Sequence, residues 1–391
     1  MSEQQLPEGW QMVKFGDIAK HISKRVEPSE TELEVYVGLE HLDPDSLKIK
    51  RHGVPSDVSG QKLLVKKDQI IFGKRRAYQR KVAVADWDCI CSAHAMVLEA
   101  NSINVVPEFL PFFMQSDVFM DRAVAVSEGS LSPTIKWKVL AEQEFCFPSK
   151  DIQKDLIKLL FSVEKALTLA SDARDSFEKL RIVTANDYLS GKKRLPGANG
   201  TWKSTKLKEI GVFKSGLTYS PDDVTNNKRD LLVLRSSNIK GRDFVLGDNV
   251  YVNCTVPIES QARVNDILIC VRNGSKHLIG KTALITEQAK YATHGAFMSL
   301  FRTEDYRFVF HLFQSIEYRK QVLRNLGATI NSINGKDLAN FKFMMPDKKE
   351  RGLISDFLEQ FDITSNVLTQ KVSDAHEVKR LLLTRVLNRE L

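Results

Sequence analysis

Hydrophobic and polar positions along the first part of the chain follow the pattern of a mixed α/β unit. Residues 108–124 are amphipathic at helical spacing, with Phe109, Phe112, Phe113 and Phe119 on the apolar side. Short β-rich runs bounded by glycine, aspartate and basic turns are typical of strands, and they lie at 35–38, 69–72, 81–85 and 144–147, the last ending at Pro148. This pattern predicts one α/β module of ordinary domain size.

From residue 151 the pattern changes to alternating three- and four-residue steps, without proline or glycine for about 40 residues. The apolar positions are Leu156, Leu159, Val163, Ala166, Ala170, Ala173, Phe177 and Leu180. A second seam near the C-terminus comprises Ile354, Leu358, Phe361, Leu368, Val372, Ala375, Leu382 and Val386, and is interrupted by Ser365 and Lys379. Sustained heptads predict two long coiled-coil helices, and their similar length favours pairing with each other. The alternative is that each helix packs on its own module.

The module and its helix occur twice in the chain, at a nearly constant offset. The matched pairs are Trp10/Trp202, Ile18/Ile210, Asp68/Asp266, Gln115/Gln314, Ser116/Ser315, Gly129/Gly327, Ile135/Ile333, Leu140/Leu338, Phe145/Phe343 and Pro148/Pro346. Matches that keep one order over most of the chain predict an internal duplication with a pseudo-two-fold axis.

The fold class expected from these patterns is α/β (α+β), with two similar mixed α/β modules and two long coiled-coil helices. We expect the first module at 1–150, the central helix at 151–190, a linker at 191–200, the second module at 201–347 and the C-terminal helix at 348–391.

Composition changes this picture by pointing to a polyanionic partner. The formal net charge is +8 and the pI is about 9.1, and phosphates attract lysine and arginine over long range. Many soluble proteins are mildly basic, so charge alone is weak support. Five cysteines without a C-x-x-C pair, a polar N-terminus and no membrane-length apolar run predict a cytoplasmic chain with free thiols.

The motifs of the common enzyme classes are absent from the sequence. It has no G-x-G-x-x-G, H-E-x-x-H or paired C-x-x-C motif, and no Asp/Asn-Pro-Pro-Tyr/Phe tetrapeptide of adenine methyltransferases. The segment 274–282 has five residues between its glycines where a P-loop needs four, which favours a β-turn. His94 and His294 occupy matching places and are interpreted as structural, or as polar groups near a bound partner. We therefore expect no catalysis, metal site or cofactor in this chain.

Two loops of the repeated module are candidates for DNA contact. The first lies between two β-runs and is rich in arginine, which reads guanine edges, and in lysine, which binds phosphate. Its candidate residues are Lys74, Arg75, Arg76, Tyr78, Gln79, Arg80 and Lys81, and their counterparts in the second module are Arg272, Asn273, Lys276 and His277. The same place holds different residues in the two copies, as expected of two readers of different sequences. A solvated charged hairpin is the alternative.

A second strip follows the amphipathic helix of each copy. Its hydroxyl and amide residues suit close approach to a sugar-phosphate backbone, and turn or helix-cap roles are equally compatible with them. The candidates are Ser132, Thr134 and Lys136 in the first copy, and Asn331, Ser332, Asn334 and Lys336 in the second. The polar loop at 235–238 is a weaker candidate.

Three motifs carry a resemblance to a known family. They are an opening Leu-Pro-x-Gly-Trp (Leu6 to Trp10), a strand ending in Phe-x-x-Pro (Phe145 to Pro148), and a helix closing in Leu-x-Gly-Lys-x-Arg (Leu189 to Arg194). In this order, and duplicated in a chain of this length, they resemble the specificity (S) subunit of a Type I restriction-modification system.

The resemblance implies that each module is a target recognition domain reading half of a bipartite double-stranded DNA site. The two helices would form an antiparallel coiled coil that sets the spacing and docks two adenine methyltransferase (M) subunits. S-adenosylmethionine, ATP and Mg would be bound by the methyltransferase and motor-nuclease (R) subunits. Two such modules should read half-sites about one helical turn apart. The alternatives are a self-sufficient DNA methylation or restriction enzyme, and a coiled-coil scaffold that binds only proteins.

Overall fold

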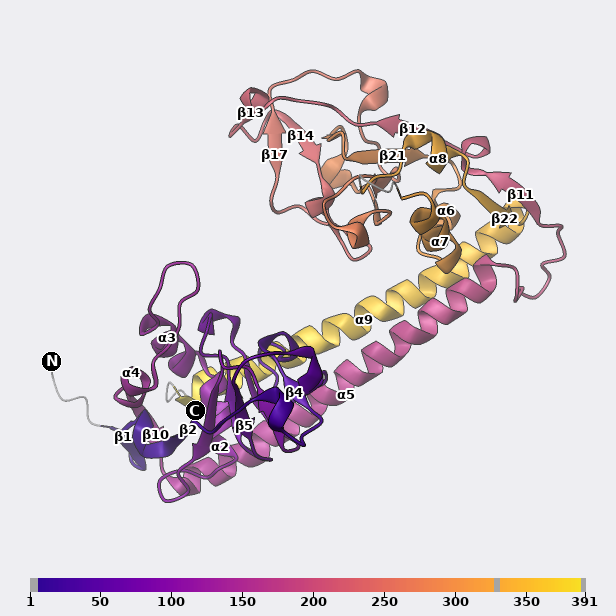
Figure 1. Ribbon diagram of the computed structural model, residues 1–391. Helices are drawn as coiled ribbons and strands as arrows, with labels where there is room; N and C mark the ends of the chain where they lie inside the picture. The colour runs from indigo at the N-terminus through magenta and orange to yellow at the C-terminus, as the bar shows by residue number, and fades with distance from the viewer. Residues whose placement is uncertain (1–5, 327–330, 388–391) are drawn as a thin grey trace. The chain divides into compact units, whose positions relative to one another are not determined.

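The computed structural model describes residues 6–326 and 331–387, and the side chain of Val386 lies outside this description. The chain divides into two compact units, one formed by Met1–Ala173 with Leu368–Leu391 and the other by Arg174–Val367. Each unit holds one mixed α/β module and a segment of each long helix (Figure 1).

The first module is built mostly from short strands. They are β1 (Trp10–Lys14), β2 (Ala19–Ile22), β3 (Arg25–Val26), β4 (Tyr36–Val37), β5 (Lys62–Val65), β6 (Ile70–Phe72), β7 (Val82–Val84), β8 (Cys89–Cys91), β9 (Met96–Ala100) and β10 (Glu144–Pro148). Its short helices are α1 (Phe15–Ile18), α2 (Phe109–Gln115), α3 (Asp117–Ala125) and α4 (Trp137–Ala141).

The second module follows the same plan with one extra hairpin. Its strands are β11 (Lys203–Lys206), β12 (Val212–Ser215), β13 (Val224–Thr225), β14 (Leu231–Leu234), β15 (Ile239–Lys240), β16 (Asp243–Phe244), β17 (Val250–Val252), β18 (Ile267–Cys270), β19 (Thr282–Leu284), β20 (Thr293–His294), β21 (Met298–Arg302) and β22 (Lys342–Met345). Its helices are α6 (Tyr306–Leu312), α7 (Ile316–Arg324) and α8 (Gly335–Ala339).

One antiparallel sheet has the same strand order in both modules. The first module has the order β2-β9-β6-β7 and the second has β12-β21-β18-β19. A two-stranded ribbon also repeats, as β1 with β10 and as β11 with β22. The duplication predicted from the sequence is therefore confirmed at the level of strand topology.

The amphipathic segment at 108–124 is two helices, α2 and α3, rather than the single helix expected. The chain breaks at Ser116, whose extended backbone ends α2 and whose Oγ accepts a hydrogen bond from the Phe119 N–H to cap α3. Ser315 caps α7 in the same way, through the Tyr318 N–H. The matched Gln-Ser pairs thus mark a helix break. The four predicted apolar phenylalanines are all buried in the core of the first unit.

The two long helices are α5 (Lys150–Leu189) and α9 (Lys348–Leu387), as predicted. In the first unit Glu164 of α5 pairs with Lys379 of α9 at 2.7 Å. In the second unit Arg181 faces Asp362, and the Tyr188 and Phe357 ring centroids lie 4.9 Å apart. Partners advance along α5 as they retreat along α9, so the segments pair antiparallel (Figure 1).

The predicted seam is correct for α9 and displaced by one residue in α5. Leu159 and Leu180 are exposed, whereas Leu160 and Leu167 are buried. The apolar periodicity misplaced the seam because three of its positions are polar. The residues concerned, Gln153, Glu164 and Arg181, are buried with partners. In α9 the described seam residues are buried or half-buried, and Lys379, an interruption in the apolar pattern, is itself buried.

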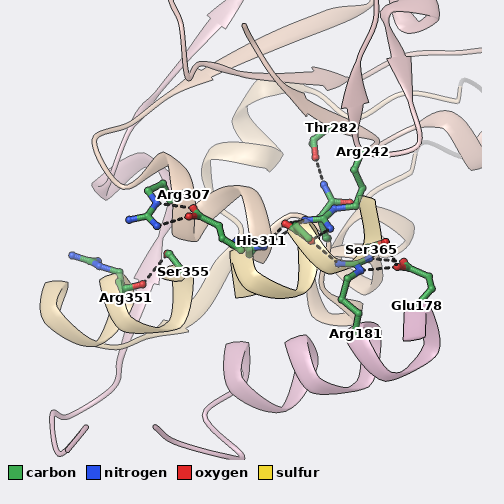
Figure 2. A network of polar contacts seen from close by, with 12 residues as sticks. Glu178, Arg181, Arg242, Thr282, Arg307, His311, Arg351, Ser355 and Ser365 are labelled. Atoms are coloured by element: carbon green, nitrogen blue, oxygen red, sulfur yellow. Dashed lines mark hydrogen bonds and ion pairs between the residues drawn. The ribbon is translucent and has the colours of Figure 1, made fainter. Parts of the chain in front are cut away.

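A polar network ties the second module to its helix segments (Figure 2). Arg242, in the turn between β15 and β16, makes a bidentate pair with Asp362 of α9, and its Nη2 lies 3.0 Å from Oδ2. His311 of α6 faces both groups, with its Nδ1 3.8 Å from Asp362 Oδ2. Arg307 of the same helix pairs with Glu359 and Asp356 further along α9. Module and helices are thus joined by charge-assisted hydrogen bonds.

Candidate nucleic-acid interface

The basic segment of the first module is the loop of a β-hairpin, as predicted. It joins the antiparallel strands β6 and β7, and its base is closed by the Gly73 N–H donating to the Lys81 carbonyl at 2.9 Å. Arg76 and Arg80 have φ of 57° and 55°, in the left-handed region that non-glycine residues rarely adopt. Such conformations persist where the surroundings hold them, and they concentrate at functional sites.

The second strip lies beside this hairpin, although nearly 60 residues separate the two in the chain. The Ile135 N–H donates to the Lys74 carbonyl at 3.0 Å, and the Arg76 N–H donates to the Pro133 carbonyl at 2.8 Å. The Arg76 guanidinium also donates to Ser132 Oγ from Nε and Nη2, at 3.3 and 3.2 Å. The two segments that the sequence singled out separately therefore form one surface, which we call the first loop pair (residues 73–81 and 128–136).

The loop at 128–134 is itself closed by two backbone hydrogen bonds. The Thr134 N–H donates to the Glu128 carbonyl at 2.9 Å, and the Glu128 N–H donates to the Thr134 carbonyl at 3.0 Å. Lys136 Nζ pairs with Glu128 Oε2 at 2.6 Å on its exposed side. At its tip Leu131 is 91% exposed. The sequence did not distinguish Leu131, because a single leucine in a serine-rich loop carries no periodic pattern.

The second module holds the corresponding pair in the same way. The Ile333 N–H donates to the Val271 carbonyl at 2.9 Å, and Arg272 and Ser332 form an isolated antiparallel bridge, as Arg75 and Thr134 do in the first module. Asn331 Nδ2 donates to the Gly274 carbonyl at 3.0 Å. We call residues 271–281 and 331–336 the second loop pair. Residues 327–330, which the sequence placed in this strip, lie outside the described residues.

The segment 274–282, whose glycine spacing was compared with that of a P-loop, is part of this hairpin. Residues 271–281 join antiparallel strands β18 and β19 through a 3₁₀ turn at Lys276–Leu278, and Thr282 begins β19. A phosphate-binding P-loop requires a helix after the glycine-rich turn, and here a strand follows. The prediction of a turn is therefore confirmed.

Two of the predicted contact residues have structural partners within the first module. The Arg80 guanidinium lies 2.7 Å from Asp45 Oδ1 and 3.0 Å from Asp117 Oδ1, and it donates to the Gln115 carbonyl. Lys81 Nζ donates to the Leu39 carbonyl at 2.6 Å. Their charges are neutralised or bound by the protein itself, so we assign Arg80 and Lys81 to holding the hairpin. The sequence could not show this, because each partner is distant in the chain.

Other residues of the first loop pair present their side chains at the surface. Arg76 and Tyr78 are exposed, and Gln79, Ser132 and Thr134 are half-buried. Lys74 is half-buried, and burial, with the neighbouring charge of Arg25, lowers its pKa. A lowered lysine pKa marks an ammonium with incomplete hydration, which an approaching anion would stabilise.

In the second loop pair, part of the predicted strip has the alternative role of a helix cap. Asn334 caps α8 by accepting from the Asp337 N–H at 2.8 Å, and Asn273 Nδ2 donates to Ser236 Oγ of the weaker polar loop. Lys276 and Lys336 are exposed, and among the residues described neither ammonium group makes a hydrogen bond or an ion pair. His277 Nδ1 lies 3.0 Å from Ser275 Oγ.

The two matched histidines differ in environment. His294 is fully buried, and its Nε2 donates to the Lys214 carbonyl at 3.0 Å, which places the ring proton on Nε2. Burial lowers its pKa, so it is a neutral structural residue. His94 is exposed and its Nε2 lies 3.2 Å from Arg75 Nη1. Of the two interpretations offered by the sequence, the structural one holds for His294, and His94 lies in the candidate interface.

No group of three or more metal-binding side chains occurs among the residues described. Within the same residues, no helix is long and apolar enough to cross a membrane. All five cysteines are free, and burial raises the pKa of the Cys89 thiol to about 12.

Comparison with known proteins gives the family of this architecture. A family model described as "Type I restriction modification DNA specificity domain" matches residues 7–175 and again 199–375, together most of the chain. Over 181 residues the chain is 27% identical to the Type I restriction enzyme StySPI specificity subunit of Salmonella potsdam, which covers 43% of this chain but only 39% of that relative. It is 21% identical to the MjaVIII specificity subunit of Methanocaldococcus jannaschii over 98% of this chain and 93% of that one.

A structure solved to explain complex assembly and conformational transition of the type I R-M system contains a chain with the same fold. Its TM-score to this protein is 0.59 at 20% identity, and the match covers 98% of each chain. With two matched specificity domains, two α/β modules of repeated topology and a paired set of long helices, this chain belongs to the family of Type I restriction-modification DNA specificity proteins.

Proposed function

We propose that this protein is the non-catalytic DNA-specificity subunit of a Type I restriction-modification complex, and that each module reads one half of a bipartite double-stranded site. The observation that carries the proposal is the loop pair. The same two segments are joined by equivalent backbone hydrogen bonds on equivalent strands, yet present different side chains in the two modules. A shared scaffold with diverged surface residues is what two readers of different half-sites require.

The residues proposed to contact DNA are the exposed or half-buried members of the two pairs. In the first pair these are Lys74, Arg75, Arg76, Tyr78, Gln79, Ser132, Thr134 and Lys136, with Arg80 and Lys81 holding the hairpin. In the second pair they are Arg272, Asn273, Lys276, His277, Asn331, Ser332, Asn334 and Lys336. The net charge of +8 supports a polyanionic partner for these surfaces.

The paired helices are proposed to set the half-site spacing and to dock two adenine methyltransferase subunits. In support, both helices carry large apolar side chains that are exposed outside the seam and that a docked subunit would cover. They are Leu159, Leu169, Val378 and Leu381 in the first unit, and Leu180, Val183, Ile363 and Val367 in the second. Methylation with S-adenosylmethionine, and ATP- and Mg-dependent cleavage by motor-nuclease subunits, would then take place in the partners, in the cytoplasm.

The test is to express the chain with its methyltransferase subunits and determine the methylated sequence in the host genome. We expect a split motif whose two parts change independently when the loop pair of one module is exchanged for that of a relative. A contiguous motif, or DNA methylation by this chain without partners, would contradict the proposal.

A variant pair tests the surface itself. Arg76→Ala should weaken binding to any duplex and reduce the salt dependence of the binding constant by about one phosphate contact. Arg51→Ala is the matched control, because Arg51 is an exposed arginine of the same module that is paired with Asp43 outside the loop pair. Equal binding by both variants would argue for a scaffold that does not contact DNA.

A further inference from the structure

An arginine lies against an exposed ring at the same place in each loop pair. In the first module the Arg75 N–H donates to the His94 carbonyl at 3.3 Å, and Nη1 lies 3.2 Å from His94 Nε2. In the second module the Arg272 N–H donates to the Phe297 carbonyl at 3.1 Å, and the Arg272 Cζ lies 4.9 Å from the centroid of the Phe297 ring.

Backbone contacts establish that the two arginines are equivalent. Each is the residue that bridges to the second strip, Arg75 to Thr134 and Arg272 to Ser332. Each follows a residue whose carbonyl accepts from a buried isoleucine N–H of that strip. Both rings come from the turn leading into an interior strand of the shared sheet, β9 in the first module and β21 in the second. His94 therefore corresponds in space to Phe297, and the sequence match with His294 concealed this.

Neither ring contributes to a core. Phe297 is 54% exposed and His94 is exposed, and neither belongs to a buried apolar cluster of its unit. Burial of an exposed phenyl ring contributes little free energy to folding. The ring contact that the structure shows for Phe297 is the one with the Arg272 guanidinium. The same backbone placement with two chemically different rings, one met at its edge and the other at its face, indicates a shared role for the pair rather than a shared residue type.

Arg75 and Arg272 retain more of their side-chain hydrogen-bonding capacity than the neighbouring arginines of the first loop pair. Arg80 is committed to Asp45 and Asp117, and Arg76 donates to Ser132. Among the residues described, Arg272 makes no side-chain hydrogen bond or ion pair, and Arg75 makes only the contact with His94. A guanidinium has five N–H donors, so both can still donate in parallel to a planar acceptor pair.

We propose that Arg75 and Arg272 are the equivalent base-reading residues of the two modules, and that each recognises a guanine in its half-site. His94 and Phe297 are positioning residues that hold these arginines. This inference rests on the proposed function. Guanine presents O6 and N7 in the major groove, the acceptor pair that a guanidinium binds with two parallel hydrogen bonds. A ring in contact with the guanidinium, through its face in Phe297 or its Nε2 in His94, restricts a flexible side chain before binding, which lowers the entropy lost on contact.

The chemistry of the two rings differs in a defined way. Arginine can only donate, so His94 accepts at Nε2 and carries its proton on Nδ1. One donor of Arg75 is thereby used, whereas the face of Phe297 leaves all five donors of Arg272 available. A phenyl ring in place of the imidazole loses the Nε2 acceptor, and we expect it to keep the positioning role through its face, as Phe297 does in the second module.

The experiment uses the full chain assembled with its methyltransferase subunits and a set of duplexes in which each G·C pair of the methylated motif is replaced in turn by A·T. For wild-type protein, one G·C pair in each half-site should discriminate by about 5- to 150-fold, the range of a bidentate contact. Arg272→Ala should remove that discrimination at one position of one half-site and leave the other half-site unchanged.

The positioning role is tested by variants of the rings. Phe297→Leu should reduce discrimination at the same position as Arg272→Ala, by about 3- to 10-fold, as expected when a side chain must be ordered on binding. Phe297→Tyr should restore it, because the ring face is kept. In the first module His94→Ala should relax one position of the other half-site, and His94→Phe should not.

Tyr291→Leu is the matched control, because Tyr291 is an exposed ring of the second module that does not belong to the loop pair, with Lys290 Nζ 5.4 Å from its centroid. Thermal unfolding of each variant checks that it is folded. Unchanged discrimination in Arg272→Ala would overturn the base-reading role, and a loss in Arg272→Ala but not in Phe297→Leu would overturn the positioning role. If wild-type protein showed no sequence preference at all, the proposed function itself would fail.

Discussion

The first module places β5 beside β8 in its second sheet, whereas the second module places β17 beside β14. The other sheet has the same strand order in both modules, and it is this shared sheet that bears the hairpins of the two loop pairs. Divergence has therefore rearranged the neighbouring sheet while retaining the scaffold that positions the loop pair. The difference indicates that loop placement, rather than the whole module, is the constrained feature.

The two modules also differ in how they are joined to the long helices. The first unit uses Lys379 of α9, buried and bound to Glu164 and to the Asp45 carbonyl at 3.0 Å. The second unit uses Arg242 of the module, bound to Asp362 (Figure 2). The long helix supplies the cation in the first unit and the module supplies it in the second. A substitution of either cation therefore affects the junction of one unit only.

The largest effect is expected at the first junction. Lys379→Met should destabilise the first unit by about 3–5 kcal/mol, because it leaves the carboxylate of Glu164 buried without its cation. Hydrogen exchange of the two units would localise the loss. Adding Glu164→Leu to the variant should recover most of the stability, and equal protection of both units in the single variant would contradict the assignment.

Acid should weaken the second junction. Burial lowers the pKa of His311 to about 4, so the folded unit keeps this imidazole neutral while the unfolded chain takes up a proton below its ordinary pKa of about 6.5. Stability is thus full above pH 6.5 and falls as the pH drops toward 4, by up to about 3 kcal/mol. Urea unfolding at several pH values would measure the slope, which His311→Gln should reduce. An unchanged slope would rule out this group.

Removal of the module's own cation at the second junction should have an intermediate effect. Arg242→Ala should destabilise the second unit by about 2 kcal/mol through loss of charge-assisted hydrogen bonds to Asp362. Arg235→Ala removes an exposed pair with Asp248 in the same module and should change stability by less than about 0.5 kcal/mol. Chemical denaturation gives the free energy of unfolding of both variants. Similar losses in the two would show that the Arg242–Asp362 pair stabilises the protein no more than an exposed ion pair does.

The smallest effect concerns one matched pair of glutamines. Gln314 Nε2 donates to Thr282 Oγ1 at 2.7 Å, whereas the buried amide of Gln115 has no hydrogen-bond partner among the described residues, and Val82 occupies the strand position of Thr282. Thr282→Val should cost about 1 kcal/mol, and Val82→Thr should gain up to that amount. Thermal unfolding measures both, and a gain from Thr282→Val would refute the explanation.

The fold could be predicted from the sequence wherever local pattern and global structure agree. The duplication, the hairpin at 73–81 and the two long helices follow from periodicity and turn residues, which act over short stretches of chain. The helix break at Ser116 and the shifted seam of α5 were missed. The serine cap is a local side-chain hydrogen bond and the buried Glu164 is paired with Lys379, and an apolar pattern records neither.

The candidate site divides in the same way. The sequence by itself determined which segments are basic and repeated, because charge and self-similarity are properties of the residues in order. Only the tertiary structure decided that the two strips of each module join, that Arg80 is held by Asp45, and that Arg272 lies over Phe297. Each of these contacts links residues distant in the chain. Their pairing is fixed by strand register and packing, which no local pattern specifies.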